Sequence, residues 1–233
     1  MLKYLKEATK GWNPYIENSD QDELVIICHG WISGPVKLNF LADFLSKKNY
    51  SIFRLNLSTT FGTVSKILNE ANSQLESIDF GKSYKKVHFL GHSFGGIILK
   101  ILLNKDDWKT TDRFVTLGTP WGSTPFAKKV ENMIKFKDDP SLFGNGIVLL
   151  KQALNNPIKN KNIKVGLIGG DKPYKEKKVD DGIKWDGTVP TESALSLKEN
   201  VVDKKIMHLN HTELINNKVV GVMVSNFFNR GKF

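Results

Sequence analysis

The 233-residue sequence contains little cysteine and little arginine. A single cysteine, Cys28, cannot form an intramolecular disulfide. It lies inside an apolar run, which favours a small buried side chain over a redox role. Only 3 of the 34 basic residues are arginines, so lysine supplies most of the formal net charge of +10. Because nucleic-acid-binding proteins usually exploit the arginine fork, we expect no nucleic-acid partner. The lysine-dense stretch at 159–178 is expected to form a solvated loop, with peripheral contact to an anionic membrane as the alternative.

The chain also lacks long hydrophobic segments. Residues 1–11 contain no apolar core of the about 7 to 15 residues that a signal peptide requires. No later stretch approaches the roughly 20 apolar residues of a membrane-spanning helix. We therefore expect a cytoplasmic protein. The length and the 40% hydrophobic content predict a single domain over residues 1–233 with one sizeable core.

One short glycine-containing motif stands out against this background. Residues 91–95 read Gly-His-Ser-Phe-Gly, with a strand predicted directly before them at 86–90 and a helix directly after them at 96–103. This pattern is typical of a nucleophile elbow, a strained turn in which the flanking positions have no room for side chains. It predicts Ser93 as a nucleophile. The alternative is a chance match in a loop that happens to contain glycine.

A second motif follows a continuous apolar run at 24–28, which is typical of a parallel strand covered on both faces. The run leads directly into His-Gly-Trp at 29–31. Acyl transfer creates a negatively charged oxygen that needs two N–H donors, one after the nucleophile and one from the exit loop of an earlier strand. The candidate donors are the backbone N–H groups of Phe94 and Trp31. We expect His29 to fix this loop by hydrogen bonding.

Together these residues resemble the α/β-hydrolase superfamily, and within it small bacterial lipases and carboxylesterases and the lipases similar to GPI-inositol deacylases. Later segments resemble further landmarks of that family in its order along the chain. The resemblance implies an α/β-hydrolase fold, a mostly parallel, doubly wound sheet with helices on both faces. The alternation of predicted strands and helices indicates the same α/β class. The segments are Leu-Gly-Thr-Pro-Trp-Gly-Ser at 117–123, Asp-Gly-Thr-Val-Pro at 186–190 and His-Thr-Glu-Leu-Ile at 211–215.

Two histidines near the C-terminus compete for the role of catalytic base. Open α/β sheets place their chemistry in loops at the carboxyl ends of the strands. A final strand predicted at 205–209 would embed His208 and leave His211 in the following loop. We therefore favour His211, which also begins the segment that resembles the histidine loop of the family.

Two aspartates compete for the role of triad acid. Asp171 directly follows a predicted strand at 163–170, where many members of the superfamily place the carboxylate. Asp186 begins the segment that resembles the acid loop of the family, and that resemblance is the more specific signal. We favour Asp186, and the choice between the two stays open at this point.

Residues 121–162 are expected to form a mostly helical insertion, because apolar stretches flank a break rich in proline and glycine at 140–146. One interpretation is a small helical cap over Ser93 that completes an acyl-binding pocket. The other is that the insertion packs sideways and contributes ordinary core residues. Trp121 stands where the family usually has histidine, so its role departs from the pattern. The residues that would line the pocket are Trp31, Phe94, Trp121 and Phe143, with Ile147, Leu149 and Leu150.

Ser93, His211 and Asp186 predict a serine hydrolase of lipase or carboxylesterase type, which cleaves acyl esters through an acyl-enzyme. This chemistry needs no metal and no organic cofactor, and no ligand cluster in the sequence indicates a metal site. The expected substrate is a small-molecule or lipid acyl ester of medium or long chain length. The alternatives are an acyl thioesterase or acyltransferase with the same triad and, less favoured, a non-catalytic binding protein on a hydrolase scaffold.

Overall fold

The computed structural model describes residues 16–17, 19–59, 62–78, 84–104, 110–122, 144–174 and 182–233. They build a seven-stranded sheet with the order β1-β3-β2-β4-β5-β6-β7. All neighbouring strands are parallel except β1, which pairs antiparallel with β3. The strands are β1 (Ile16–Glu17), β2 (Glu23–Cys28), β3 (Ser51–Leu55), β4 (Lys86–His92), β5 (Thr111–Leu117), β6 (Lys164–Gly170) and β7 (Val201–Met207).

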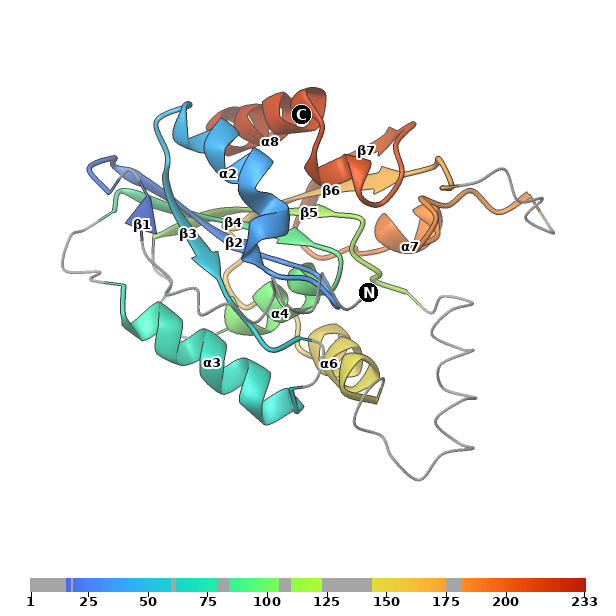
Figure 1. Cartoon of the computed structure of the whole chain (residues 1–233), viewed down its shortest axis with the longest axis horizontal. Helices are drawn as coiled ribbons and strands as arrows, with labels where there is room; N and C mark the ends of the chain where they lie inside the picture. Colours follow the sequence, from blue (N-terminus) through green and yellow to red (C-terminus); the bar gives the residue numbers. More distant parts are fainter. Residues whose placement is uncertain are drawn as a thin grey trace.

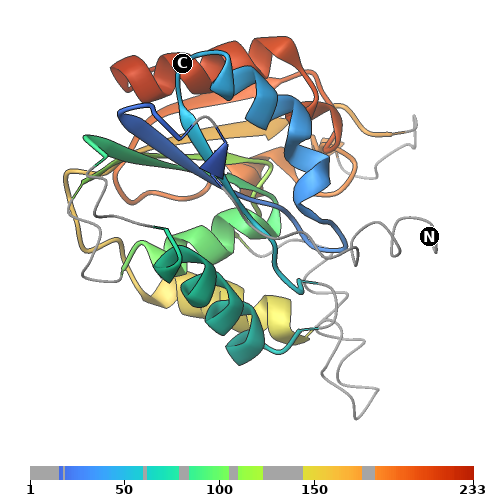
Figure 2. The same cartoon turned by 60° about the vertical axis from the view of Figure 1, so that its left-hand side comes forward.

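Helices cover both faces of the sheet. Figures 1 and 2 show α2 and α8 on one face and α3, α4 and α6 on the other. This arrangement confirms the predicted doubly wound α/β-hydrolase fold. The helices are η1 (Pro35–Leu38), α2 (Asn39–Ser46), α3 (Val64–Glu76), α4 (Phe94–Leu102), α6 (Gly144–Asn155), α7 (Thr191–Ala194), η3 (Glu213–Ile215) and α8 (Lys218–Arg230).

The apolar run of β2 explains why this strand is buried on both sides. Leu24, Ile26 and Cys28 pack into the core on the side of α3, α4 and α6. Val25 and Ile27 alternate with them and pack on the side of α2 and α8. Successive side chains of a strand point to opposite faces, so a strand between two helical layers needs an uninterrupted apolar sequence. Cys28 is a free, buried thiol, and burial raises its pKa.

The last strand differs from its predicted position. It spans Val201–Met207 rather than 205–209, so His208 lies just after the strand and is not embedded in it. β7 is an edge strand whose residues are mostly exposed or half-buried, including Val202 and Ile206. Exposed lysines such as Lys204 suit an edge strand, because charge discourages pairing with other chains. Because β7 mixes lysines with apolar residues, its sequence predicts a strand only weakly.

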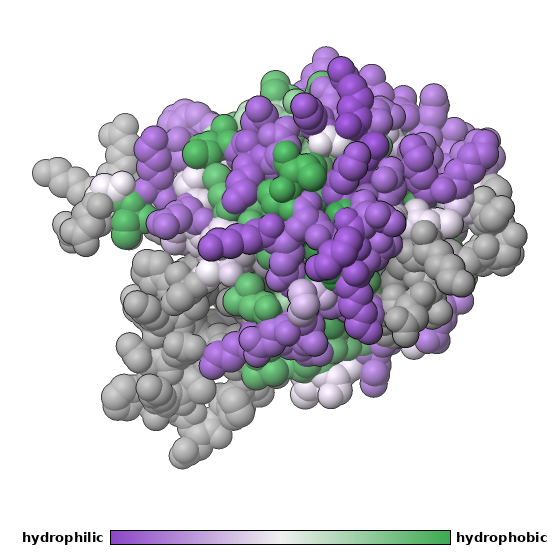
Figure 3. Space-filling view, turned by 180° about the vertical axis from the view of Figure 1, so that it is seen from behind, coloured by the Kyte–Doolittle hydropathy of each residue, from purple (hydrophilic) through white to green (hydrophobic). Residues whose placement is uncertain are grey.

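The side of the molecule opposite to the view of Figure 1 is mainly hydrophilic, with hydrophobic residues in separate patches between polar ones (Figure 3). In the part of the chain that the structure describes, no helix is both long enough and apolar enough to cross a membrane.

Candidate active site

Ser93 occupies the turn between β4 and α4. Its backbone has φ 53° and ψ −127°, a conformation that L-residues rarely adopt. A side chain at Gly91 would collide with the backbone of Gly96. One at Gly95 would collide with the carbonyl oxygen of Cys28. Both glycines that flank the serine are therefore needed for the close approach of backbone segments that the elbow requires.

His211 and Asp186 form a buried hydrogen-bonded pair. His211 Nδ1 lies 2.7 Å from Asp186 Oδ2, and the two side chains are 10% and 1% exposed. The backbone N–H of His211 also donates to the carbonyl oxygen of Asp186, at 2.8 Å. When Nδ1 donates its proton to the carboxylate, Nε2 of the neutral ring carries no proton and can accept one. The pair can therefore supply a general base.

Asp186 begins a turn that is closed by hydrogen bonds among its own residues. The second carboxylate oxygen, Oδ1, accepts the N–H groups of Thr188 at 2.9 Å and Val189 at 2.7 Å. The Asp186 N–H donates to the carbonyl oxygen of Val189 at 3.1 Å, and Trp185 and Pro190 form an isolated antiparallel bridge across the turn. These hydrogen bonds hold the carboxylate in one orientation within the turn. We call residues 185–190 the acid turn.

The end of β5 lies between the elbow and the pair. The Ser93 N–H donates to the carbonyl oxygen of Leu117 at 2.9 Å. The next residue, Gly118, has φ 55°, and a Cβ atom there would lie 3.0 Å from both Asp186 Oδ2 and His211 Nδ1. Among the described residues, the Ser93 hydroxyl makes no hydrogen bond to the His211 ring. Such bonds between nucleophile and base often shorten only when substrate binds.

The loop after β2 is fixed by His29. Its Nδ1 donates to the carbonyl oxygen of Gly30 at 2.9 Å, and its Nε2 accepts the N–H of Leu57 at 3.2 Å. The hydroxyl of Thr59 donates to the same Gly30 oxygen at 3.0 Å. Burial lowers the pKa of His29 to about 4, so the ring stays neutral with its proton on Nδ1. His29 therefore has the loop-fixing role expected from the sequence.

This loop contacts the elbow. A Cβ atom at Gly30 would lie 3.0 Å from Ser93 Cβ. Trp31 follows Gly30, and Phe94 is the first residue of α4. N–H groups in the first turn of a helix have no partner within the helix and lie at the positive end of its dipole. The two predicted oxyanion donors, Trp31 and Phe94, thus belong to the two segments that meet at the serine.

Comparison with known proteins gives the family. Residues 50–230 match the family described as an α/β hydrolase of unknown function, DUF915. The chain belongs to this family. No curated protein matches the sequence.

Several solved structures share the fold of this α/β hydrolase at low sequence identity. One comes from a study of LipS and LipT, two metagenome-derived lipolytic enzymes, with a TM-score of 0.71, 12% identity, and coverage of 95% of this chain and 98% of that chain. The lipase BlEst2 of Bacillus licheniformis has a TM-score of 0.65, 15% identity, and coverage of 94% and 98%. Est1E from Butyrivibrio proteoclasticus has a TM-score of 0.60, 15% identity, and coverage of 93% and 92%. These likenesses show the fold, and family membership supports a hydrolase.

The structure brings His211 together with Asp186 and keeps the two competing residues apart from them. Asp171 Oδ1 lies 2.9 Å from His208 Nδ1, and the His208 side chain is 80% exposed. Both aspartates therefore have a histidine partner. Only the Asp186–His211 pair is buried and borders the end of β5 beside the elbow.

The predicted pocket residues lie in different surroundings. Trp31 is half-buried and packs against the core, and Phe94 is buried. Trp121 is also buried. Its ring meets that of Phe114 edge-on, with centroids 6.4 Å apart, and its indole N–H points to the Thr116 hydroxyl at 3.4 Å. Contact of Trp31, Phe94 and Trp121 with substrate stays a prediction.

The described part of the 121–162 insertion includes α6, which packs against α4 and α3. Leu149 is fully buried in the core on that side of the sheet, as the sideways interpretation predicts for this residue. Phe143 lies outside the described residues, as do the side chains of Ile147 and Leu150. The stretch 123–143, which would have to provide most of a cap, also lies outside them, so the cap stays a prediction.

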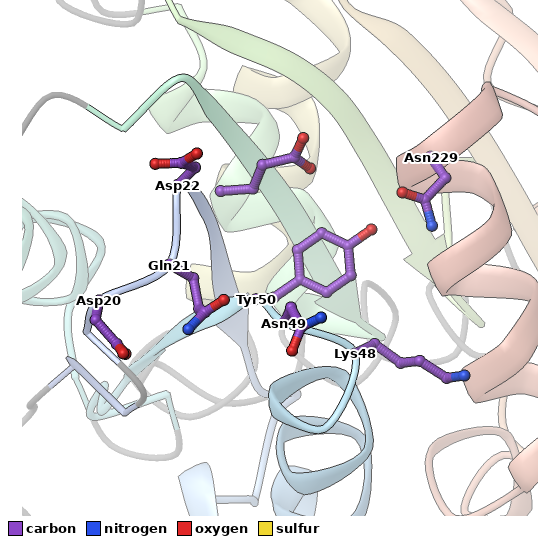
Figure 4. A pocket seen from close by; sticks show the side chains of 8 residues that line it. Asp20, Gln21, Asp22, Lys48, Asn49, Tyr50 and Asn229 are labelled. Atoms are coloured by element: carbon purple, nitrogen blue, oxygen red, sulfur yellow. The ribbon is translucent and has the colours of Figure 1, made fainter.

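A groove of about 400 Å³ opens at the N-terminal ends of the parallel strands, opposite the end that carries Ser93, Asp186 and His211. It is lined by residues 20–23 at the start of β2, by residues 48–50 before β3 and by Asn229 of α8. Figure 4 shows the Tyr50 ring at the centre, with Asp22 on one side and Asn229 on the other. Burial, with Glu23 nearby, raises the pKa of Tyr50 to about 12. The polar lining gives an acyl chain little apolar surface to bind.

Two residues beside the Asp186–His211 pair have roles that sequence motifs alone do not predict. Gly118 belongs to the Leu-Gly-Thr-Pro segment, so a signal for it was present, but its contact with the pair depends on the fold. The sequence indicates only that His92 belongs to the elbow motif, although its ring centroid lies 4.6 Å from that of His211. Within the described residues, no group of three or more histidine, cysteine or acidic side chains could hold a metal ion.

Proposed function

We propose that this protein is a serine esterase that hydrolyses carboxylic esters through an acyl-enzyme. The observation that carries the proposal is the buried Asp186–His211 hydrogen bond of 2.7 Å beside the turn that holds Ser93 at a positive φ. The family and the lipolytic fold neighbours support the hydrolase class.

In the proposed mechanism, Ser93 Oγ attacks the ester carbonyl while His211 Nε2 takes its proton. Asp186 orients the ring and stabilises the imidazolium. The N–H groups of Trp31 and Phe94 donate to the oxyanion, and removing one such donor costs about 3 kcal/mol in well-studied enzymes. The imidazolium then protonates the departing alcohol. Water, deprotonated by the same histidine, attacks the acyl-enzyme and releases the acid.

The test is covalent labelling with a fluorophosphonate, read by intact mass and peptide mapping. We expect one adduct, on Ser93, and none in Ser93→Ala, whose side chain fits the elbow but cannot attack. Failure of the folded wild-type protein to react would favour a non-catalytic binding protein. Nitrophenyl esters and acyl-CoA thioesters, assayed with and without an alcohol acceptor, then separate an esterase from a thioesterase or an acyltransferase.

A further inference from the structure

His92 links three segments of the candidate site. Its Nε2 lies 3.1 Å from the carbonyl oxygen of His211, and the two rings have centroids 4.6 Å apart at an angle of 44°. A Cβ atom at Gly30, in the loop after β2, would lie 3.4 Å from His92 Nδ1. His92 itself directly precedes Ser93 and is buried. One ring thus touches the loop of the candidate base, the oxyanion loop and the elbow.

The hydrogen bond defines the tautomer of His92. A carbonyl oxygen can only accept, so the proton must be on Nε2. Burial and the charge of His211 hold the pKa of His92 well below its ordinary value, so the ring stays neutral near pH 7. A charged ring at this distance would oppose formation of the His211 imidazolium, which the neutral ring does not.

We propose that His92 is a positioning residue that holds the main chain of His211 in place for proton transfer. Within the described part of the chain, three hydrogen bonds fix His211: its N–H to the Asp186 carbonyl, its Nδ1–H to the Asp186 carboxylate, and its carbonyl oxygen to His92. Asp186 alone leaves the carbonyl side of the residue without support. Because proton transfer depends on the position of Nε2 to within a fraction of an ångström, loss of the third bond slows chemistry. The kinetic part of this proposal rests on the proposed function.

The experiment compares two substitutions at this position. His92→Phe keeps an aromatic ring against His211 but removes the donor, and His92→Gln places an amide N–H near the position of Nε2. We expect His92→Phe to lower kcat for a nitrophenyl ester by on the order of 100-fold with little change in KM, and His92→Gln to recover most of the loss. His88→Phe is the matched control, since His88 is a fully buried histidine of the same strand whose Nε2 bonds Glu23 at 3.0 Å. It should lower stability and leave kcat unchanged.

A second readout does not depend on turnover. In wild-type protein at pH 7, ring ¹⁵N shifts should show His92 protonated on Nε2 only. The downfield Nδ1–H proton of His211 should be sharp in wild type and His92→Gln and lost or broadened in His92→Phe.

A proton on His92 Nδ1, or His92→Phe with wild-type kcat and an unchanged His211 resonance, would overturn the proposal. If His92→Phe does not fold, the positioning proposal is tested by the tautomer of His92 in wild type and by the kcat of His92→Gln. If wild type proves inactive, the esterase proposal fails, and the resonances still test the positioning role.

Discussion

Asp171 and His208 are hydrogen-bonded to each other, with 2.9 Å between Oδ1 and Nδ1. The described residues therefore include two aspartate–histidine pairs at the same end of the sheet, with hydrogen bonds of similar length, but the His208 side chain is 80% exposed and that of His211 is 10% exposed. An exposed pair is screened by water and contributes little energy, whereas a buried pair holds its geometry and interacts more strongly. Burial, rather than residue type, separates the candidate catalytic pair from its neighbour.

The first prediction follows from this difference. Asp186→Asn and His211→Ala should each lower kcat for a nitrophenyl ester by on the order of 10⁴-fold, because each removes an oriented base. Asp171→Asn and His208→Ala are the matched controls and should change kcat only slightly. Severe losses in the control variants instead would transfer the assignment to the exposed pair.

The second prediction concerns strain at the nucleophile. Ser93→Gly and Ser93→Ala both remove the hydroxyl, but only glycine relieves the positive φ of this position. We expect both variants to be inactive and Ser93→Gly to be more stable than Ser93→Ala by about 1 kcal/mol, since such strain costs about 1 to 3 kcal/mol and glycine loses more entropy on folding. Urea unfolding measures the difference. Equal stabilities would mean that the strain is no larger than the entropic cost of glycine.

The third prediction tests the packing of Gly118 against the candidate pair. Gly118→Ala places a methyl group 3.0 Å from Asp186 Oδ2 and His211 Nδ1, so it should displace the pair and lower kcat strongly. Gly182 also has a positive φ, 66°, but nothing lies within 4 Å of a Cβ atom there. Gly182→Ala should therefore cost only the backbone strain, about 1 kcal/mol of stability, and leave kcat unchanged. A similar kcat in the two variants would argue against the importance of this contact.

The fourth prediction is a loss of stability in mild acid. Burial lowers the pKa of His29 to about 4, below its value of about 6.5 in an unfolded chain. As the pH falls below 6.5, the unfolded chain takes up a proton at His29 before the folded protein does. The stabilising contribution is therefore complete above pH 6.5 and is lost as the pH falls towards 4, by up to about 3 kcal/mol. In urea unfolding at pH 7 and pH 5, His29→Asn should lose less stability than wild type. An equal loss would show that His29 is not the group responsible.

The fifth prediction concerns chain length and depends on the proposed function. Each methylene of an acyl chain that packs against the aromatic residues near Ser93 should contribute up to about 0.8 kcal/mol. Only the part of this burial retained in the transition state raises kcat/KM. We expect kcat/KM to rise from acetyl to about octanoyl nitrophenyl esters and to exceed that for peptide substrates. A maximum at acetyl would exclude a lipase-like acyl pocket.

The central strands could be predicted from the sequence because both of their faces are buried. The run at 24–28 is of strand length and apolar throughout, which is typical of a strand in the middle of a parallel sheet. The edge strand β7 could not be located as well, because its lysines and exposed valine need no burial and the apolar residues near 207 shifted the expected boundaries towards the C-terminus.

The elbow could be predicted for a related reason, since Gly91 and Gly95 are local requirements of a tight turn. The partners of the nucleophile could not be fixed in this way. Position after a strand favours Asp171, and only the folded chain shows that this residue pairs with His208 while Asp186 lies against Gly118. Long-range contacts such as that of His92 with the His211 carbonyl, 119 residues away, leave no periodic signal in the sequence.

The acid turn has a consequence for how the length of this chain can change. Its carboxylate is held by N–H groups two and three residues further on and by the bridge between Trp185 and Pro190, all within six residues. The number of residues that separate this unit from β6 therefore has little influence on where the carboxylate lies. We therefore expect the acid turn to keep its local geometry when the length of the chain between β6 and residue 185 changes, and the Nδ1–H resonance of His211 in an insertion variant would report whether it does.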